Sequence, residues 1–287
     1  TFYSYWFIET AQVALFYAEQ LEKENIKCKT CTRAHGFDLY EIRNPAGFFP
    51  FREYVLKSIN YVYPCSEDGK QYLIQHYPRY KEKIFKRYLG TCEHGMNPEK
   101  GNGYFTIVTC SNLVPVKRLD LVAEALKYLE LLYSDIKIKW ICIGDGPERE
   151  HIQGLVSSLK VCKVDFLGSM KNAEVLEWYK SNHVDLFVNT SSSEGLPVSI
   201  MEVSSFGIPS LATNVGGTSE IVIEAENGKL LPENLTAEML GEEIKYFFEM
   251  PLAERERLRL RARQIWENSF SAEKNYRAFA EELHSGH

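Results

Sequence analysis

The feature that most constrains the fold is an alternation of short apolar segments with helical patterns over the last two-thirds of the chain. Each apolar segment ends near small or polar residues, after which apolar residues recur every three or four positions. A chain of this kind forms a doubly wound parallel sheet with helices on both faces. The predicted strands are 104–110, 136–143, 164–167, 184–189 and 208–212, and the predicted helices between them are 119–132, 148–159, 173–181 and 197–206.

The first third of the chain shows the same alternation, so we expect a second α/β unit there. A polar segment rich in Gly, Pro and Asn at 93–103 (EHGMNPEKGNG) predicts a linker between the two units. We therefore predict domains at 1–103 and 104–268, with a helix at 269–287 that packs back toward the first domain. The predicted helices of the first domain are 10–21, 51–59 and 69–76, its strands are 26–32, 61–65 and 84–89, and the C-terminal helices are 237–250, 252–267 and 272–283.

The charge of the chain is negative overall but uneven. A formal net charge of −6 disfavours nucleic acid as a partner. Residues 1–103 carry +2, whereas residues 104–287 carry −8. Cations alternate with aromatic residues near 79–87, where they either contact an anionic lipid or acceptor or form an ordinary solvated surface. These residues are Arg79, Lys81, Lys83, Lys86 and Arg87, with Tyr77, Tyr80, Phe85 and Tyr88.

Nothing in the sequence predicts secretion or a membrane span. No segment approaches the roughly 18 uninterrupted apolar residues that a spanning helix needs, and no basic region precedes an apolar one at the N-terminus. We expect a cytoplasmic protein, with peripheral contact at the inner membrane face as a further option. The seven scattered cysteines are expected to be reduced thiols. Cys28 and Cys31 form a CxxC pair, but no second pair at comparable spacing accompanies it, so we expect no metal site.

The ends of the predicted strands are the places to look for a site, because ligands of open parallel sheets bind beyond the carboxyl ends of the strands. After the first strand, Lys117 and Arg118 form either a cation pair for a diphosphate or an ordinary helix-start cluster. After the second strand, IGDGPE places Gly144 in a tight turn that lets another group approach the backbone. This spacing is not the full GxGxxG motif of dinucleotide-binding proteins. Gly168 after the third strand likewise indicates only a tight turn.

The most informative segment, SSSEGLPVSIMEVSSFGIPSLATNVGGTSE at 191–220, follows the fourth strand. Glu194 lies at the strand-to-helix turn, and the free N–H groups that begin the next helix form an anion site. Glu202 lies further along that helix between apolar neighbours. One carboxylate suits a sugar hydroxyl and the other a ribose diol. The alternative for Glu202, a helix-start charge favoured by the helix dipole, is weaker because a buried carboxylate needs a partner.

A histidine in the first domain is a further candidate. The motif RAHGFD at 33–38 places His35 directly after a predicted strand and before Gly36. Its imidazole either faces a cleft between the domains, or it is an ordinary structural or surface side chain. Asp38 shares the same two interpretations.

Together these motifs resemble the retaining GT-B glycosyltransferases of family 4. The resemblance is strongest in EGLPVSIME, with its Glu-x7-Glu spacing, followed by GIP and NVGGTSE. It extends through SNLVPVKRLDLVAEAL, IGDGPE and VDFLG, and so covers nearly all of 104–287. The segments YSYWF, RAHGFDLYE, PFREYVLK, SEDGKQYL and YLG resemble the first domain of bacterial members that build capsular, exopolysaccharide or other surface glycans.

The resemblance implies a GT-B fold, with two Rossmann-like domains facing a cleft, and it implies roles for the motif residues. Lys117 would hold the donor diphosphate, Glu194 would contact hydroxyls of the donor sugar, and Glu202 would hold the ribose. His35 would sit beside the donor sugar, so the expected catalytic residues are His35, Glu194 and Lys117. The implied donor site comprises Asn112, Lys117, Arg118, Gly144, Glu194, Gly195, Leu196, Val198, Ser199 and Glu202, with main-chain N–H groups of Gly195, Leu196, Val198 and Ser199 on phosphate and sugar.

The chain departs from the family pattern in two places. The common Gly-Arg pair before the lysine is Ser111-Asn112 here, so Arg118 or Asn112 is expected to compensate for the missing arginine. The family's first domain begins with a strand, a Gly-rich loop and a helix, whereas this chain opens on TFYSYWFIETAQVALF, which matches the middle of that domain. We therefore expect an incomplete first domain and a chain that binds donor nucleotide but transfers sugar poorly.

The resemblance implies transfer of a hexose from a UDP- or GDP-linked donor to a glycan or lipid-linked acceptor, with retention of anomeric configuration and no cofactor or metal. A donor phosphate oxygen would assist deprotonation of the acceptor, and neither glutamate would be a covalent nucleophile. The residues themselves indicate that Lys117 and helix N–H groups neutralise the diphosphate. Two alternatives stay open: a sugar-nucleotide binding module without turnover, and a nucleotide-sugar epimerase on the same architecture.

Overall fold

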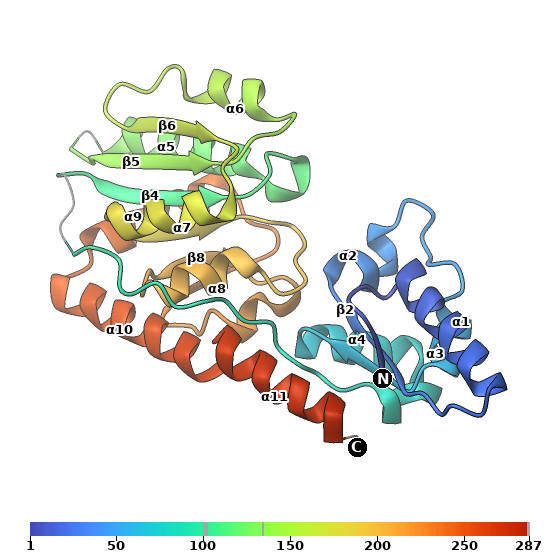
Figure 1. Cartoon of the computed structure of the whole chain (residues 1–287). Helices are drawn as coiled ribbons and strands as arrows, with labels where there is room; N and C mark the ends of the chain where they lie inside the picture. Colours follow the sequence, from blue (N-terminus) through green and yellow to red (C-terminus); the bar gives the residue numbers. More distant parts are fainter. Residues whose placement is uncertain (100–102, 134, 286–287) are drawn as a thin grey trace. The chain divides into compact units, whose positions relative to one another are not determined.

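The structure is a computed structural model that describes residues 1–99, 103–133 and 135–285. The chain divides into two units (Figure 1). Unit 1 comprises Thr1–Gly90, Glu194–Leu196 and the C-terminal helix from Ala272, and unit 2 comprises Thr91–Ser193 and Pro197–Ser271. The boundary between them therefore comes after Gly90, before the predicted boundary at residue 103.

Unit 1 is built on a sheet of three parallel strands in the order β1-β2-β3. Its elements are β1 (Phe2–Ser4), α1 (Glu9–Lys23), β2 (Thr30–Ala34), α2 (Gly36–Leu39), η1 (Glu41–Arg43), α3 (Arg52–Ser58), β3 (Tyr61–Pro64), α4 (Glu67–His76), η2 (Pro78–Lys83) and α11 (Ala272–Ser285). The middle strand β2 is buried on both faces. Ala34 packs in an apolar cluster with Leu15 of α1 and Leu56 of α3, whereas Cys31 packs with Phe279 of α11.

The C-terminal helix α11 belongs to unit 1 through several contacts. The ring of Phe279 meets that of Tyr63 edge to face, with centroids 5.0 Å apart. The buried guanidinium of Arg33 lies 4.5 Å from the Phe279 ring and donates to the carbonyl oxygen of Arg87 at 2.9 Å. Arg87 in turn forms an ion pair with Glu282, with Nη2 2.7 Å from Oε1. Helix α11 thus packs on the face of the sheet that carries Tyr63.

Unit 2 is built on six parallel strands in the order β6-β5-β4-β7-β8-β9, which confirms the predicted doubly wound sheet. Its elements are β4 (Phe105–Cys110), η3 (Pro115–Lys117), α5 (Leu119–Leu132), β5 (Ile138–Ile143), α6 (Arg149–Val156), β6 (Lys163–Gly168), α7 (Asn172–Ser181), β7 (Leu186–Asn189), α8 (Val198–Ser205), β8 (Ser210–Thr213), η4 (Gly216–Glu220), β9 (Gly228–Leu231), α9 (Ala237–Glu249) and α10 (Leu252–Ser269). The strand order reverses between β4 and β7. A ligand crevice forms at such a reversal, at the carboxyl ends of the strands.

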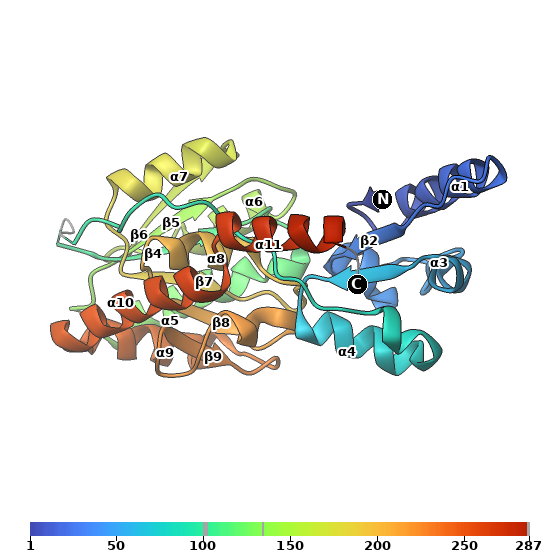
Figure 2. The same ribbon diagram turned by 60° about the horizontal axis from the view of Figure 1, so that its bottom comes forward.

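Helices cover both faces of the sheet of unit 2 (Figures 1 and 2). Helices α5 and α9 pack together on one face, where Leu126 and Ile244 join Trp140 of β5 in the main apolar core. Helices α7 and α8 lie on the opposite face (Figure 1). There the rings of Tyr179 and Phe206 lie 5.6 Å apart. This double cover explains why the strands appear in the sequence as continuous apolar runs rather than as strict alternation.

Most predicted elements are confirmed to within a few residues, but the strand expected at 26–32 begins only at Thr30. The chain leaves α1 through Asn25, which is in the left-handed region (φ 64°). The N–H of Ile26 then donates back to the carbonyl oxygen of Leu21 at 2.9 Å. Because these residues are held in the C-terminal turn of the helix, β2 forms further along the chain.

The edges of both sheets also differ from the prediction. Segment 84–89 runs beside β3 with an isolated bridge from Ile84 to Val62, and it is not a strand. The sixth strand of unit 2, β9, is absent from the prediction because GKLL is too short for a periodic pattern. A Cβ at Gly228 would lie 1.9 Å from the carbonyl oxygen of Ser210, so glycine permits the close pairing of β9 with β8.

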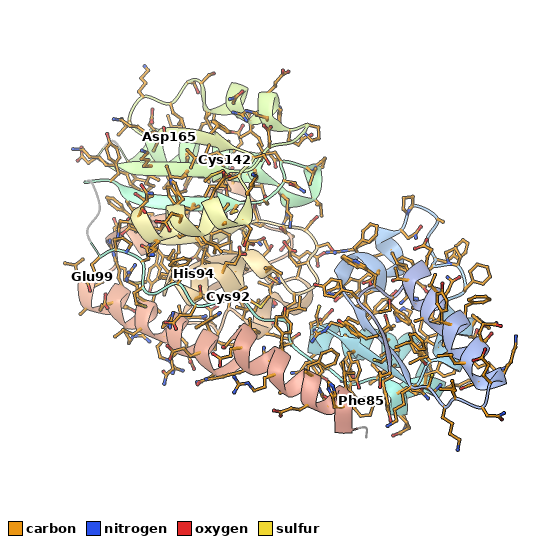
Figure 3. All side chains as sticks on the ribbon, viewed as in Figure 1. Phe85, Cys92, His94, Glu99, Cys142 and Asp165 are labelled. Carbon is orange, nitrogen blue, oxygen red and sulfur yellow. The ribbon has the colours of Figure 1, made fainter. Side chains whose placement is uncertain are left out.

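The predicted linker at 93–103 is, in its described part, packed against unit 2; residues 100–102 lie outside the described residues. Asn97 is buried, and its side-chain amide donates to two main-chain carbonyl oxygens at 2.6 and 2.8 Å. The ring of His94 stacks on that of Phe206, with centroids 5.7 Å apart. Figure 3 shows this segment, with His94 labelled, running along α8 and α10. Its polar composition therefore reflects specific hydrogen bonds rather than a free linker.

Candidate functional site

A small hollow lies at the carboxyl ends of β4 and β7, where the strand order of unit 2 reverses. Lys117 lines it together with Thr109 and the segment after β7. Thr190 holds the turn η3 in place, because its hydroxyl lies 2.7 Å from the carbonyl oxygen of Lys117 and 3.0 Å from that of Arg118. The half-buried Lys117 side chain therefore belongs to the crevice that the topology predicts for a ligand.

The neighbouring cation Arg118 has a different role. Its backbone is in the left-handed region (φ 47°, ψ 45°), at the start of α5. Its guanidinium donates to the carbonyl oxygen of Thr190 at 2.7 Å and to that of Glu233 at 2.8 Å. These bonds tie the loop after β7 to the loop after β9. The expectation that Arg118 compensates for a missing phosphate-binding arginine stays a prediction.

The glycines after β5 serve the packing of two loops. A Cβ at Gly144 would lie 1.9 Å from the carbonyl oxygen of Ser111, and one at Gly146 would lie 2.4 Å from that of Leu113. The N–H of Leu113 donates to the carbonyl oxygen of Asp145 at 2.9 Å. The group that approaches the turn at Gly144 is therefore the chain's own segment Ser111-Asn112-Leu113. Asn112, the other candidate for compensation, lies exposed on that segment.

The segment that leads into α8 presents several main-chain donors. Among the described residues, no protein acceptor bonds to the N–H groups of Gly195, Leu196, Val198 or Ser199. Pro197, the N-cap residue of α8, has no N–H and lacks a side-chain cap. Unpaired N–H groups at a helix N-terminus bind anions, because the donors and the helix dipole act in the same direction.

Glu202 lies on α8 beside the end of β4. Its carboxylate accepts a hydrogen bond from the side-chain amide of Asn172, the first residue of α7, at 2.7 Å. Burial raises the pKa of Glu202, and the Asn172 hydrogen bond opposes that effect. After burial, the nearby Glu202 carboxylate is the main cause that raises the pKa of the Cys110 thiol to about 12. The carboxylate therefore has the partner that a buried acid requires, and it lies near the crevice.

Glu194 belongs to unit 1, at the beginning of a segment that contacts the start of α2. A Cβ at Gly195 would lie 2.6 Å from the main-chain nitrogen of Gly36. Conversely, a Cβ at Gly36 would lie 2.9 Å from the Cα of Gly195. Only glycine at both positions permits this approach of two backbones. It brings the half-buried Glu194 close to the loop that carries His35.

His35 of unit 1 is a buried side chain whose ring nitrogens make no hydrogen bond within the described part of the chain. Its ring lies between the rings of Tyr5 and Trp6, with centroids 4.6 and 4.7 Å away. The nearest carboxylate oxygen, Oδ2 of Asp38, is 3.8 Å from Nδ1. A buried imidazole with two unpaired nitrogens is suited to a hydrogen bond with a ligand.

A buried carboxylate holds the loop around His35. Asp38 is fully buried, and its two carboxylate oxygens accept from the main-chain N–H of His35 at 2.5 Å and from that of Phe7 at 2.7 Å. Arg52 donates to the carbonyl oxygen of Asp38 at 2.5 Å. Its guanidinium stacks on Phe7 and Phe49, 4.0 and 4.4 Å from the ring centroids. Asp38 therefore ties the loop after β1 to the loop after β2.

Sequence reasoning found the motif residues but missed most of their partners. Spacing alone could not reveal Asn172, which meets Glu202, or Thr190, which holds the lysine turn. The aromatic pair Tyr5 and Trp6 was visible only as part of a family-like string. Arg52 gave no signal, because a single arginine at a helix start is ordinary on a protein surface.

Most of the basic and aromatic residues at 77–88 bond to or pack against other residues of unit 1. Lys83 donates to three carbonyl oxygens at the end of α3, at 2.8 to 3.1 Å, and Lys86 donates to Tyr88 at 3.0 Å. Only Arg79 and Lys81 of the five cations are exposed. Over the described ranges, no helix has the length and apolar character needed to cross a bilayer.

The CxxC pair lies at the start of unit 1 and contains free thiols. Cys31 lies in β2, and burial raises its pKa to about 11. Among the described residues, no cluster of three or more His, Cys, Asp or Glu side chains could hold a metal ion. Cys31 thus contributes to the core rather than to a reactive site.

Comparison with known sequences identifies one family. Residues 96–265 match the family described as glycosyl transferases group 1. An uncharacterized glycosyltransferase of Haemophilus influenzae is 29% identical over 137 residues, which cover 47% of this chain and 37% of that protein. The N-acetyl-alpha-D-glucosaminyl L-malate synthase of Bacillus anthracis is 31% identical over 126 residues, 43% of this chain and 31% of that protein. The matches thus span about a third of the length of these relatives.

Comparison with solved structures gives the fold. The structure of Anabaena HepE in complex with UDP and glucose superposes with a TM-score of 0.73 at 19% identity. The match covers 97% of this chain and 76% of HepE. The predicted fold class, α/β with parallel sheets of the GT-B type, is thereby confirmed.

Proposed function

Because the chain belongs to the glycosyl transferases group 1 family, we propose that it transfers a sugar from a nucleotide-sugar donor to a glycan or lipid-linked acceptor. UDP is the first nucleotide to test, since the similar HepE structure contains UDP and glucose. GDP is the second. Neither a binding module without turnover nor an epimerase draws support from a specific contact in the structure.

One observation carries this proposal: Lys117 lines the crevice at the strand-order reversal of unit 2. A cation there can neutralise the diphosphate that leaves when the glycosidic bond to the donor breaks. Within unit 2, the unpaired N–H groups of Val198 and Ser199 at the start of α8 add fixed dipoles that favour an anion. Glu202 has acceptor oxygens for a ribose diol, and Glu194 for hydroxyls of the donor sugar.

The binding step can be tested by titrating UDP, GDP, ADP and CMP against the chain and its variants. We expect one diphosphate to bind, and Lys117→Ala or Glu202→Ala to weaken it by roughly 10- to 150-fold, the loss of a charge-assisted hydrogen bond. Lys180→Ala, which removes an exposed lysine of α7, is the matched control and should bind as the wild type does. Unchanged nucleotide affinity in both site variants would show that this crevice is not the nucleotide-binding site.

The transfer step is proposed to retain the anomeric configuration and to continue in EDTA. The sequence has no Asp-x-Asp motif after a strand, and the cationic crevice can replace a divalent ion at the diphosphate. Proton NMR of the first-formed product reads the configuration directly. An inverted product, or activity that EDTA abolishes and Mg²⁺ or Mn²⁺ restores, would contradict this mechanism.

A further inference from the structure

A hollow of about 400 Å³ lies in unit 1. Its wall includes Phe37 of the RAHGFD motif and Phe51 of the PFREYVLK segment, but none of the implied donor-site residues. It is formed by the start of α1, by α2 and by the loop that precedes α3. We call it the Phe37–Phe51 hollow. Its lining residues are Ile8, Glu9, Gln12, Phe37, Asn44, Phe49, Pro50 and Phe51. All of them belong to unit 1.

Two aromatic rings of the hollow remain open to solvent. Phe37 is 67% exposed and Phe51 is 63% exposed. Phe51 is also in the left-handed region (φ 62°, ψ 10°), which is costly for a bulky residue. Glycine or asparagine would relieve that strain, yet the position carries a large ring that is not buried in a core. An exposed ring in a strained conformation at the wall of a hollow indicates a binding surface.

The polar groups of the hollow indicate what kind of ligand fits. Glu9 contributes a carboxylate, which only accepts hydrogen bonds when ionised, and Gln12 contributes a carboxamide. Asn44 uses its carbonyl oxygen to accept from the N–H of Ala46 at 2.9 Å, which leaves its NH₂ group as a donor. The lining residues include no cation, so a phosphate group would meet only the repulsion of Glu9. An alkyl chain would leave these polar groups without partners.

A pyranose ring satisfies both sets of groups. Its C–H face packs on an aromatic ring, and its vicinal hydroxyls donate to a carboxylate while they accept from a carboxamide. The hollow is also joined to the loop of His35. Phe37 lies two residues after His35, and Phe49 stacks on Arg52, which bonds to Asp38. A sugar in the hollow would therefore rest against the elements that position the unpaired imidazole.

We propose that the Phe37–Phe51 hollow binds a neutral pyranose unit of a glycan acceptor, with Phe37 and Phe51 as the stacking surfaces and Glu9 as the hydroxyl-binding group. The inference rests on the proposed function and names the acceptor class and its site. It assigns the specificity for the acceptor to residues that lie outside every motif of the donor site.

Saturation-transfer NMR on the full chain tests the proposal. The probes are methyl α- and β-glycosides of glucose, galactose, mannose and N-acetylglucosamine, with n-octyl phosphate as the lipid-like probe. We expect saturation transfer to at least one glycoside, reduced at least fivefold in Phe51→Gly and in Glu9→Gln. Phe51→Gly removes the ring but keeps the left-handed backbone, so it should fold at least as well as the wild type. Phe16→Ala and Glu22→Gln, exposed residues of α1 outside the hollow, are the matched controls and should leave the signal unchanged.

The proposal is overturned if no glycoside shows transfer, if the signal survives in both hollow variants, or if n-octyl phosphate binds in a Phe51-dependent way instead. A parallel titration with UDP, GDP, ADP and CMP separates this inference from the proposed function. Nucleotide binding without glycoside binding overturns the acceptor site alone. Failure of all four nucleotides to bind overturns the proposed function, whatever the glycosides show.

Discussion

Two histidines with largely enclosed side chains, one in each unit, differ in their partners. In unit 2, His183 has Nδ1 2.5 Å from the carbonyl oxygen of Pro98 and Nε2 3.1 Å from the carboxylate of Asp185. In unit 1, the side chain of His35 is similarly enclosed, but neither ring nitrogen makes a hydrogen bond within the described chain. A histidine whose nitrogens are both satisfied by protein serves the structure, whereas one with neither satisfied is available to a ligand.

Two neighbouring cations of unit 2 differ in where their side chains lie. Arg118 donates to the carbonyl oxygens of Thr190 and Glu233, and so joins loops after β7 and β9. Lys117, one residue earlier, lines the hollow at the crevice. Sequence position could not distinguish these two roles, because both residues stand in one short loop before a helix. The direction of each side chain in the folded unit distinguishes them.

The largest effect is expected from the carboxylate that holds the His35 loop. Asp38→Ala removes the acceptor of two buried main-chain N–H groups, so it should lower the free energy of unfolding by roughly 2–6 kcal/mol. Asp38→Asn keeps one acceptor oxygen and should lose about half as much. Urea unfolding followed by circular dichroism measures both. A loss below about 1 kcal/mol for Asp38→Ala would show that the loop of unit 1 is held by something else.

An intermediate effect is expected where two glycines meet. Gly195→Ala places a Cβ 2.6 Å from a backbone nitrogen that cannot move aside, so it should cost about 1–3 kcal/mol of stability and lower donor turnover. Gly154→Ala in α6 is the matched control, since nothing lies within 4 Å of the new Cβ. It should gain about 0.5–1 kcal/mol from better helix formation, with turnover unchanged. Equal stability of the two variants would argue against the close contact with Gly36.

The smallest effect is a pH dependence that marks His183 as structural. Burial alone lowers the pKa of His183, but its hydrogen bonds to Asp185 and to the Pro98 carbonyl outweigh burial and raise the pKa overall. A raised folded pKa contributes stability below the unfolded pKa of about 6.5, and that contribution is lost as the pH rises through the folded value. The stability difference between wild type and His183→Ala should therefore be larger at pH 5.5 than at pH 8.5.

Urea unfolding at the two pH values measures this difference, and exposed His151→Ala serves as the matched control. A difference for His183→Ala that is equal at both pH values, or larger at pH 8.5, would contradict the structural role of the Asp185 pair.

The sequence predicted the sheet of unit 2 well, because its strands are buried apolar runs and its helices are long enough to show their period. It failed where the local signal is short, as in β9, or where a packed segment has a polar composition, as around Asn97. The pairing of Asn97 with main-chain groups of α7 depends on contacts between residues distant in sequence. No local pattern carries that information.

The residues of the candidate site also differ in how far the sequence could predict them. Lys117, Glu194 and Glu202 could be proposed from the sequence because each stands in a continuous motif that follows a predicted strand. The surroundings of His35 come from three segments, after β1, after β2 and at the start of α3, which only the folded unit brings together. The Phe37–Phe51 hollow is likewise built from separate segments, and its strained Phe51 gives no sign in the sequence.

The two histidines can be compared directly in one assay of UDP release from UDP-glucose. We expect His35→Ala to lower turnover by at least about 100-fold, the range for a group that assists a proton transfer or positions the reacting sugar, while its free energy of unfolding stays close to that of the wild type. We expect the reverse for His183→Ala, which should lose stability but keep the wild-type turnover per folded molecule. Wild-type turnover in a folded His35→Ala variant would show that the unpaired histidine does not mark a functional site of unit 1.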